Sequence, residues 1–287
     1  MDKKAKKLFD GREAVIATMH KKEQVIAPIL KSELGINIIV PNEFNSDVFG
    51  TFTNEVERMG DQLEAARKKV EVAMLQSGLN IGVASEGSFG QHPIFSFAPF
   101  NRELILFVDK DLDLEITGYV ANGNTNYAQK EVGSFEEAYE FAKSIGFPEH
   151  GVIVKKSATT TDQNEIIKGI TDVDRLRNSI TFFTKSQQTA FIETDMRAMY
   201  NPTRMNNIKL ATLDLVSKLN SLCPSCQTPG FEVIEVKKGL PCHLCGFPTN
   251  MPLLQIYECK KCKHQKETKY PNGNKHADPT YCNVCNP

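Results

Sequence analysis

The sequence predicts an α/β protein with a mixed central sheet and flanking helices, followed by a small zinc-ribbon-like module with two four-cysteine zinc sites. Short apolar runs alternate with segments of helical periodicity over about the first two hundred residues. All eight cysteines lie after residue 222, in four Cys-x-x-Cys pairs. We therefore expect a basic N-terminal tail at 1–11, an α/β ligand-binding domain at 12–220 and a zinc-binding module at 221–287.

Apolar periodicity predicts the strands and helices of the first half of the α/β domain. Glu13–Thr18 is a short apolar run suited to a buried strand, and Lys22–Leu34 has apolar residues at helical spacing. Pro28 must lie in the first turn of this helix or kink it, because proline lacks an N–H donor. The next elements are expected as a strand at 36–40, a helix at 61–76, a strand at 79–85, and adjacent strands at 103–109 and 114–121.

The second half of this domain begins with a helix signal. Ser134 and Glu137 form a capping box, and Gly146 ends the helix that follows. The remaining elements are expected as a strand at 151–154, a weaker helix at 173–183, a strand at 189–193 and a helix at 205–219. We expect all the strands in one largely buried sheet.

The cysteine spacing predicts structural zinc. A gap of two residues lets both thiolates of a pair face one ion, and two pairs complete a tetrahedral shell of four thiolates. A disulfide framework, an iron–sulfur cluster and a redox Cys-x-x-Cys site are disfavoured alternatives. The zinc ligands are Cys223, Cys226, Cys242, Cys245, Cys259, Cys262, Cys282 and Cys285.

The pairing of these cysteines stays open. Sequential pairing joins the first pair to the second and the third to the fourth. Nested pairing joins the two middle pairs, whose flanks Cys-x-x-Cys-Gly and Tyr-x-Cys-x-x-Cys look like halves of one ribbon.

Net charge and hydropathy limit the classes of partner that the protein can have. The net charge is -1, which gives no global attraction to nucleic acid, and no apolar run is long enough to span a membrane. We therefore expect a cytoplasmic protein without a membrane partner, and the sequence leaves both a monomer and an oligomer open. The zinc module also carries a lysine cluster, which predicts either nucleic-acid contact or a solvated hairpin face. Its members are Lys260, Lys261, Lys263, Lys266 and Lys269.

Candidate chemistry in the α/β domain is expected where strands end, because open α/β sheets bind ligands beyond the carboxyl ends of their strands. The residues predicted to bind phosphate are Thr18, His20, Lys22, Arg197 and Arg204. The predicted catalytic carboxylates, which would hold Mg²⁺ or Mn²⁺ and orient water, are Glu55, Glu86 and Asp195. The structural alternative is that Glu86 caps a turn and that the two arginines pair with Glu193 and Asp195.

The whole chain resembles an uncharacterised bacterial family of unknown function. The segments that carry this resemblance are the paired cysteines, Gly50-Thr-Phe-Thr53, Ala84-Ser-Glu-Gly-Ser-Phe-Gly90, Glu193-Thr-Asp-Met-Arg197 and Asn201-Pro-Thr-Arg-Met205. The resemblance implies no activity.

The N-terminal domain also distantly resembles the inosine/xanthosine triphosphate pyrophosphatases, through the segments Val15–Thr18, Gly50–Phe52, Leu63–Lys68 and Ala84–Gly87. That resemblance implies phosphate contacts for Thr18 and Lys22, metal roles for Glu55 and Glu86, and a base-proximal role for Arg197. The chain departs from the family pattern at several positions. His20 replaces an Asn of the first motif, and Lys22 lies one residue earlier than the lysine of the family. A single Glu86 replaces a pair of Asp residues, and Met196-Arg197 replaces a His-Arg pair.

Three functions from different classes follow. The first is a divalent-metal-dependent hydrolase acting on a nucleotide phosphate, similar to a nucleotide pyrophosphatase. The second is a nucleic-acid- or ribosome-associated zinc-ribbon protein. The third is a non-catalytic binding or assembly protein.

Overall fold

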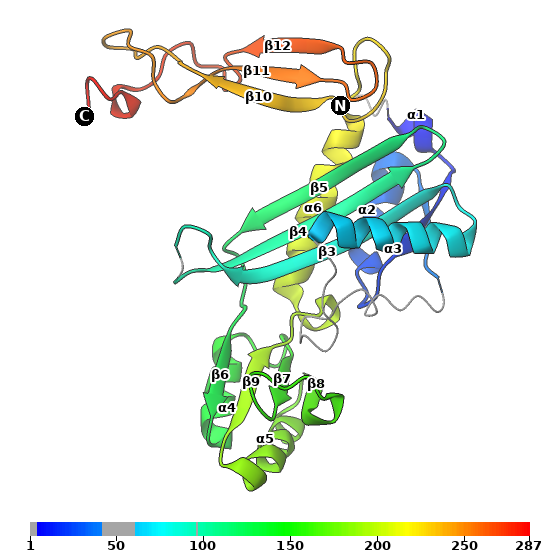
Figure 1. Ribbon diagram of the computed structural model, residues 1–287, viewed down its shortest axis with the longest axis vertical. Helices are drawn as coiled ribbons and strands as arrows, with labels where there is room; N and C mark the ends of the chain where they lie inside the picture. Colours follow the sequence, from blue (N-terminus) through cyan, green and yellow to red (C-terminus); the bar gives the residue numbers. More distant parts are fainter. Residues whose placement is uncertain (1–4, 42–60, 96) are drawn as a thin grey trace. The chain divides into compact units, whose positions relative to one another are not determined.

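The computed structural model describes residues 5–41, 61–95 and 97–287 and has the predicted α/β fold with a C-terminal ribbon (Figure 1). The chain divides into two compact units, Phe9–Val216, and Ser217–Pro287 together with the N-terminal segment up to Leu8. In chain order the elements are α1 (Lys6–Phe9), β1 (Glu13–Ala17), α2 (Glu23–Leu34), β2 (Asn37–Ile39), α3 (Gln62–Ser77), β3 (Ile81–Gln91), β4 (Pro99–Asp109), β5 (Leu114–Asn122), β6 (Gln129–Val132), α4 (Phe135–Ser144), β7 (Val152–Lys155), η2 (Gln163–Glu165), β8 (Ile166–Ile170), α5 (Val173–Gln187), β9 (Ala190–Thr194), η3 (Ala198–Tyr200), α6 (Pro202–Asn220), β10 (Glu232–Lys238), β11 (Pro252–Glu258), β12 (Gln265–Lys269) and η4 (Pro279–Tyr281).

The described end of the predicted N-terminal tail is packed. Residues Lys6–Phe9 form α1, and Phe9 is fully buried with its ring 5.5 Å from that of Phe107. None of the described helices is both long and apolar enough to cross a bilayer.

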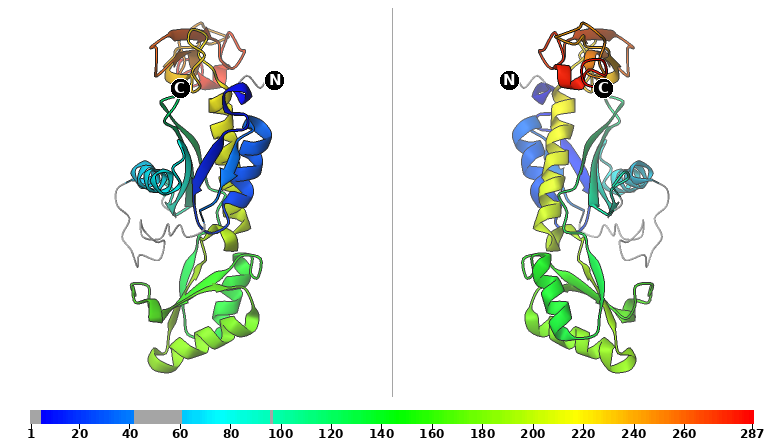
Figure 2. Two further views of the ribbon diagram at one scale, coloured as in Figure 1. Left: turned by 90° about the vertical axis from the view of Figure 1, so that its right-hand side faces the viewer. Right: turned by 90° about the vertical axis from the view of Figure 1, so that its left-hand side faces the viewer.

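The first sheet is mixed, as predicted, with the described strands in the order β2-β1-β3-β4-β5. Strands β2, β1 and β3 are parallel, and β4 and β5 continue the sheet antiparallel. Figure 2 shows α3 on one face of this sheet and α2 and α6 on the other. The α3 face packs Val70, Ala73 and Met74 against Val15 and Ala84. This helix begins at a capping box of Asp61 and Glu64 and ends at Gly78.

Strand β3 extends beyond the end of β1. Its pairs with β1 run over Gly82–Ala84, whereas its pairs with β4 continue to Gln91. Ser85 and Glu86 therefore lie beside the carboxyl end of β1, where the chain turns into α2. The sheet register thus places the predicted strand-end residues next to each other.

The later strands form a second sheet, whereas the sequence analysis expected one sheet. Its described strands lie in the order β6-β9-β7-β8, and all pairs are antiparallel. Helices α4 and α5 cover it and bury their own apolar cluster with it, including Ala138, Ala142, Leu176 and Ile180. Because α4 and α5 pack against these strands in a separate core, the strands bury their apolar side chains without joining the first sheet.

Helix α6 approaches strand β5 closely at Gly118. A Cβ atom at this position would lie 2.6 Å from the Leu215 Cβ atom and would also overlap the Ala211 carbonyl oxygen. The backbone of α6 cannot move away without losing the buried contacts of Ile208 and Leu215. Glycine is therefore required for this helix–sheet contact.

We predict that Gly118→Val destabilises the protein by about 3 kcal/mol or more, because the added side chain overpacks against backbone atoms. The measurement is the free energy of unfolding in urea, followed by circular dichroism. Gly90→Ala is the matched control, since a Cβ at Gly90 meets no atom within 4 Å. Equal stabilities of the two variants would contradict the close approach of α6.

Candidate functional site

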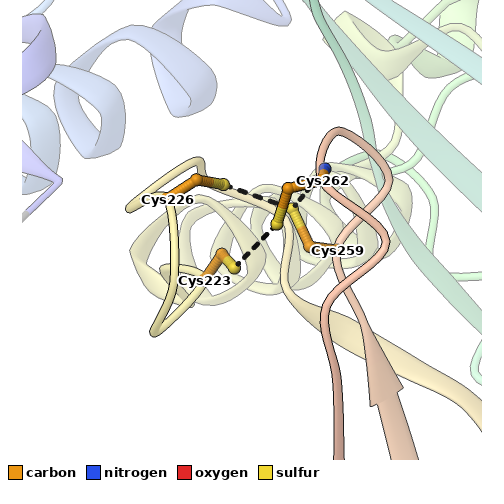
Figure 3. Close-up of side chains that lie close together, drawn as sticks. All are labelled: Cys223, Cys226, Cys259 and Cys262. Atoms are coloured by element: carbon orange, nitrogen blue, oxygen red, sulfur yellow. Dashed lines mark hydrogen bonds between the residues drawn. The ribbon is translucent and has the colours of Figure 1, made fainter.

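The cysteines of the described chain gather in two four-sulfur groups, each with all sulfur atoms within 4.8 Å of one another. The first centre contains Cys223, Cys226, Cys259 and Cys262, which converge in Figure 3. The second centre contains Cys242, Cys245, Cys282 and Cys285.

The sulfur–sulfur distances fit zinc. They are 3.6 Å for Cys223–Cys262 and for Cys226–Cys259, and 3.9 Å for Cys242–Cys285. Zn–S bonds of about 2.3 Å in a tetrahedron place neighbouring sulfurs about 3.8 Å apart, whereas a disulfide needs about 2 Å. The cysteines are free thiols, so each group can hold one zinc ion.

The pairing of the Cys-x-x-Cys motifs differs from both arrangements that the sequence analysis considered. The first motif joins the third, and the second joins the fourth. Sequential and nested pairing are therefore both wrong, and the arrangement is interleaved.

The strands of the ribbon explain this pairing. The described strands β10, β11 and β12 form an antiparallel sheet in that order. The first motif precedes β10 and the third connects β11 to β12, so both lie at one end of the sheet. The second motif connects β10 to β11 and the fourth follows β12, so both lie at the other end. At about 3.3 Å per residue, seven-residue strands separate the two ends by about 20 Å.

The cysteines within one centre differ in their pKa. Backbone N–H groups of Cys262 and Leu244 donate to the sulfurs of Cys259 and Cys242, at 3.5 and 3.4 Å. Hydrogen bonds with the Thr228 hydroxyl and backbone lower the pKa of Cys226 to about 6. In contrast, despite a backbone hydrogen bond at His264 that acts to lower it, burial and the neighbouring thiols raise the pKa of Cys262 to about 11. Thiolate is the form that binds zinc.

Part of the lysine cluster has structural partners. Lys260 pairs with Glu232 at 2.9 Å, and Lys263 pairs with Glu258 at 3.5 Å. Lys266 and Lys269 lie on β12, the edge strand of the ribbon sheet, where lysines oppose edge-to-edge association. Contact of this cluster with nucleic acid stays a prediction.

A second candidate site is a cluster of charged side chains buried inside the α/β unit. It contains the predicted residues Lys22, Glu86 and Arg204 together with Lys69 and Glu103, and each is at most 7% exposed. We name this set the buried charged site. It lies where β3 runs past the end of β1.

Ion pairs organise the buried charged site on both faces of the sheet. Lys69 of α3 pairs with Glu86 at 2.5 Å. Arg204 of α6 donates from Nε to Glu103 of β4 at 2.8 Å and also donates to the Met196 carbonyl oxygen. A Cβ at Gly87 would lie 2.5 Å from the Arg204 guanidinium and 2.8 Å from the Glu103 carboxylate. Gly87 therefore makes room for this ion pair.

Lys22 differs from the other cations of the site. Its ammonium donates to the Ser85 carbonyl oxygen at 2.9 Å and has no carboxylate partner within the described part of the chain. Burial, followed by repulsion from Arg204, lowers the pKa of Lys22 to about 7, although Glu86 and Glu103 oppose the shift. Burial likewise raises the pKa of Glu103 against the attraction of Arg204 and Lys22. The Ser85 hydroxyl is buried and lacks a hydrogen-bond partner among the described residues.

The turn between β1 and α2 has an unusual backbone. His20 and Lys21 both have left-handed conformations, with φ of 65° and 61°. Such conformations cost free energy for residues other than glycine and tend to occur at functional sites. The neighbouring Thr18 hydroxyl donates to the Met19 carbonyl oxygen at 3.0 Å, so a phosphate contact would replace this bond.

The remaining predicted residues lie apart or have partners. Asp195 pairs with Arg197 at 2.6 Å and accepts from the Gly169 N–H, and Arg197 lies over the Tyr200 ring. These contacts match the structural alternative for that pair. Glu55 lies outside the described residues. Within those residues, the cysteine centres are the groups of His, Cys, Asp or Glu suited to a metal, so the expected Mg²⁺ or Mn²⁺ is not supported.

Sequence analysis missed Lys69 and Glu103. Lys69 lies on the same face of α3 as Ala66 and Ala73, and Glu103 shares a face of β4 with Ile105. A charged residue in an otherwise apolar periodicity is the signal that would have found both.

A family model described as "Domain of unknown function (DUF6671)" matches residues 69–287. No curated protein matches the chain. The expectation of a family of unknown function is confirmed, whereas similarity to the inosine/xanthosine triphosphate pyrophosphatases is not supported. Most segments that carried that similarity precede residue 69 and lie outside the match.

Double variants distinguish the pairing of the motifs. We predict that Cys226→Ser with Cys259→Ser removes one zinc per chain, because both residues serve the first centre. Cys226→Ser with Cys242→Ser removes both, because it damages each centre. The measurement is zinc per chain by plasma mass spectrometry, with two ions in the parent protein. Sequential pairing predicts the reverse result for the two double variants.

Proposed function

Because the chain belongs to the DUF6671 family, whose function is unknown, we propose its function from the buried charged site: the α/β unit binds the phosphate of a nucleotide and hydrolyses that nucleotide. The observation that carries the proposal is Lys22, a buried ammonium whose described hydrogen bond goes to a single carbonyl oxygen. The zinc centres are assigned a structural role, since closed four-thiolate sites leave no open position for a substrate.

The surroundings of Lys22 favour an anion. A lysine ammonium has three donors, and the bond to Ser85 uses one of them. The Ser85 hydroxyl, which has no hydrogen-bond partner among the described residues, is a further donor. Lys22 directly precedes the first turn of α2, whose N–H groups attract negative charge. A phosphate oxygen near Lys22 would offset the burial and repulsion that lower its pKa.

Glu86 is the residue to which we assign the orientation of the attacking water. It lies next to Ser85 on β3, and the ion pair with Lys69 fixes its carboxylate. Lys69 is therefore a positioning residue in this proposal. The sequence prediction of Mg²⁺ or Mn²⁺ is retained as a condition of the assay.

We predict that zinc-loaded protein releases phosphate or pyrophosphate from at least one nucleotide in a screen with Mg²⁺ or Mn²⁺. Glu86→Gln should lower kcat by about 100-fold or more, as loss of a positioned carboxylate does in hydrolysis. Glu71→Gln is the matched control, because Glu71 is exposed on α3. Absence of release from every nucleotide would overturn the proposed hydrolysis, and full activity of Glu86→Gln would overturn the role assigned to Glu86.

We also predict pH-dependent binding of sulfate, which remains a dianion between pH 5 and 9. An anion favours protonated Lys22, so affinity should be highest below the Lys22 pKa of about 7 and fall by about tenfold or more by pH 8.5. Calorimetric titration of Lys22→Met should show weak binding without this dependence. The charged groups that face Lys22 are Lys69, Glu86, Glu103 and Arg204. His20→Gln tests the titratable neighbour on the same turn, and a flat profile in the parent protein would contradict the role of Lys22.

A further inference from the structure

We infer that the groove between α2 and the first turns of α6 binds the base of the nucleotide. This inference rests on the proposed function, and it assigns the part of the ligand that lies beyond the phosphate. The groove has a volume of 430 Å³, within the range of small-molecule sites. Its lining residues are Val25, Ala198, Met199, Pro202, Met205, Asn206 and Lys209.

The groove and the buried charged site share their structural elements. Val25 lies one helical turn after Lys22 on α2, and Met205 follows Arg204 on α6. The Met196 carbonyl oxygen that accepts from Arg204 lies just before η3, which supplies Ala198 and Met199. Three residues of helix rise by about 4.5 Å, a separation that the sugar of a nucleotide can span.

The lining chemistry fits a flat heterocycle. Met199 and Met205 offer polarisable thioethers that pack well against aromatic rings, and Val25 and Pro202 complete an apolar wall. Asn206 has both a donor and an acceptor for the edge of a base, and Lys209 adds donors. Pro202, Met205, Asn206 and Lys209 recur at helical spacing, so one stripe of α6 presents them together.

The partly exposed Met199 adds to the apolar surface of the groove. Met199 is 37% exposed beside an apolar wall, which leaves apolar surface in water. A bound base would cover this surface while leaving Asn206 and Lys209 at the rim. The groove would then supply affinity and base preference, and the site around Lys22 would supply phosphate binding.

The test compares ligands with and without a base. Calorimetry with inorganic pyrophosphate, ADP, GDP, CDP and UDP measures the dissociation constant of each for the full-length protein. At least one nucleoside diphosphate should bind tenfold or more tightly than pyrophosphate. Asn206→Ala and Met199→Ala should each reduce that preference at least fivefold and leave the pyrophosphate affinity unchanged. Leu213→Ala is the matched control, since Leu213 is exposed on α6 outside the groove lining.

The outcomes separate this inference from the proposed function. If pyrophosphate binds but no nucleotide binds more tightly, or if the groove variants keep the parent preference, the groove does not hold the base and phosphate binding stands. If neither pyrophosphate nor any nucleotide binds, phosphate binding fails and the inference fails with it.

Discussion

The ion pair of Arg204 and Glu103 joins the parts of the α/β unit. Arg204 is one of the largest fully buried side chains, and it links the start of α6 to β4 and to the Met196 carbonyl oxygen after β9. A buried ion pair is stabilised by the hydrogen bonds between its partners, and removal of one partner typically costs about 3–5 kcal/mol. Gly87 provides the space that this pair needs. One electrostatic arrangement thus includes Gly87 on β3, the buried Arg204 and the buried Lys22.

Local signals predicted much of the fold and part of the site. Helix α3 is encoded by its capping box and apolar spacing, and Lys22, Glu86 and Arg204 were found because each follows or neighbours a strand end. Lys69 and Glu103 were missed although each interrupts an apolar face, and their ion-pair partners depend on contacts between distant segments, such as the one between α3 and β3. The second sheet was missed for the same reason. Strand β9 lies between β6 and β7, and local sequence patterns do not predict which distant strands pair.

The Cys-x-x-Cys motifs that make up the two four-cysteine groups were predictable because their spacing is local, whereas their pairing depends on the number of strands between the motifs. Strands β10 and β12 are rich in Glu, Gln and Lys, so their apolar alternation is weak and the meander is hard to recognise from sequence. The ribbon buries few apolar residues, and one of its buried clusters consists of Cys223, Phe231 and Cys259. Zinc held by the two four-cysteine groups would therefore contribute much of the folding free energy of this part.

Interleaving has a consequence for how this module can change in evolution. In a chain of sequential zinc fingers, one finger is a continuous segment that can be duplicated, lost or exchanged by itself. Here the segments that close the first and second centres overlap between Cys242 and Cys262, so no cut between Cys223 and Cys285 leaves a complete centre on each side. The ribbon is inherited as one indivisible block, and recombination can preserve both centres only with breakpoints outside it.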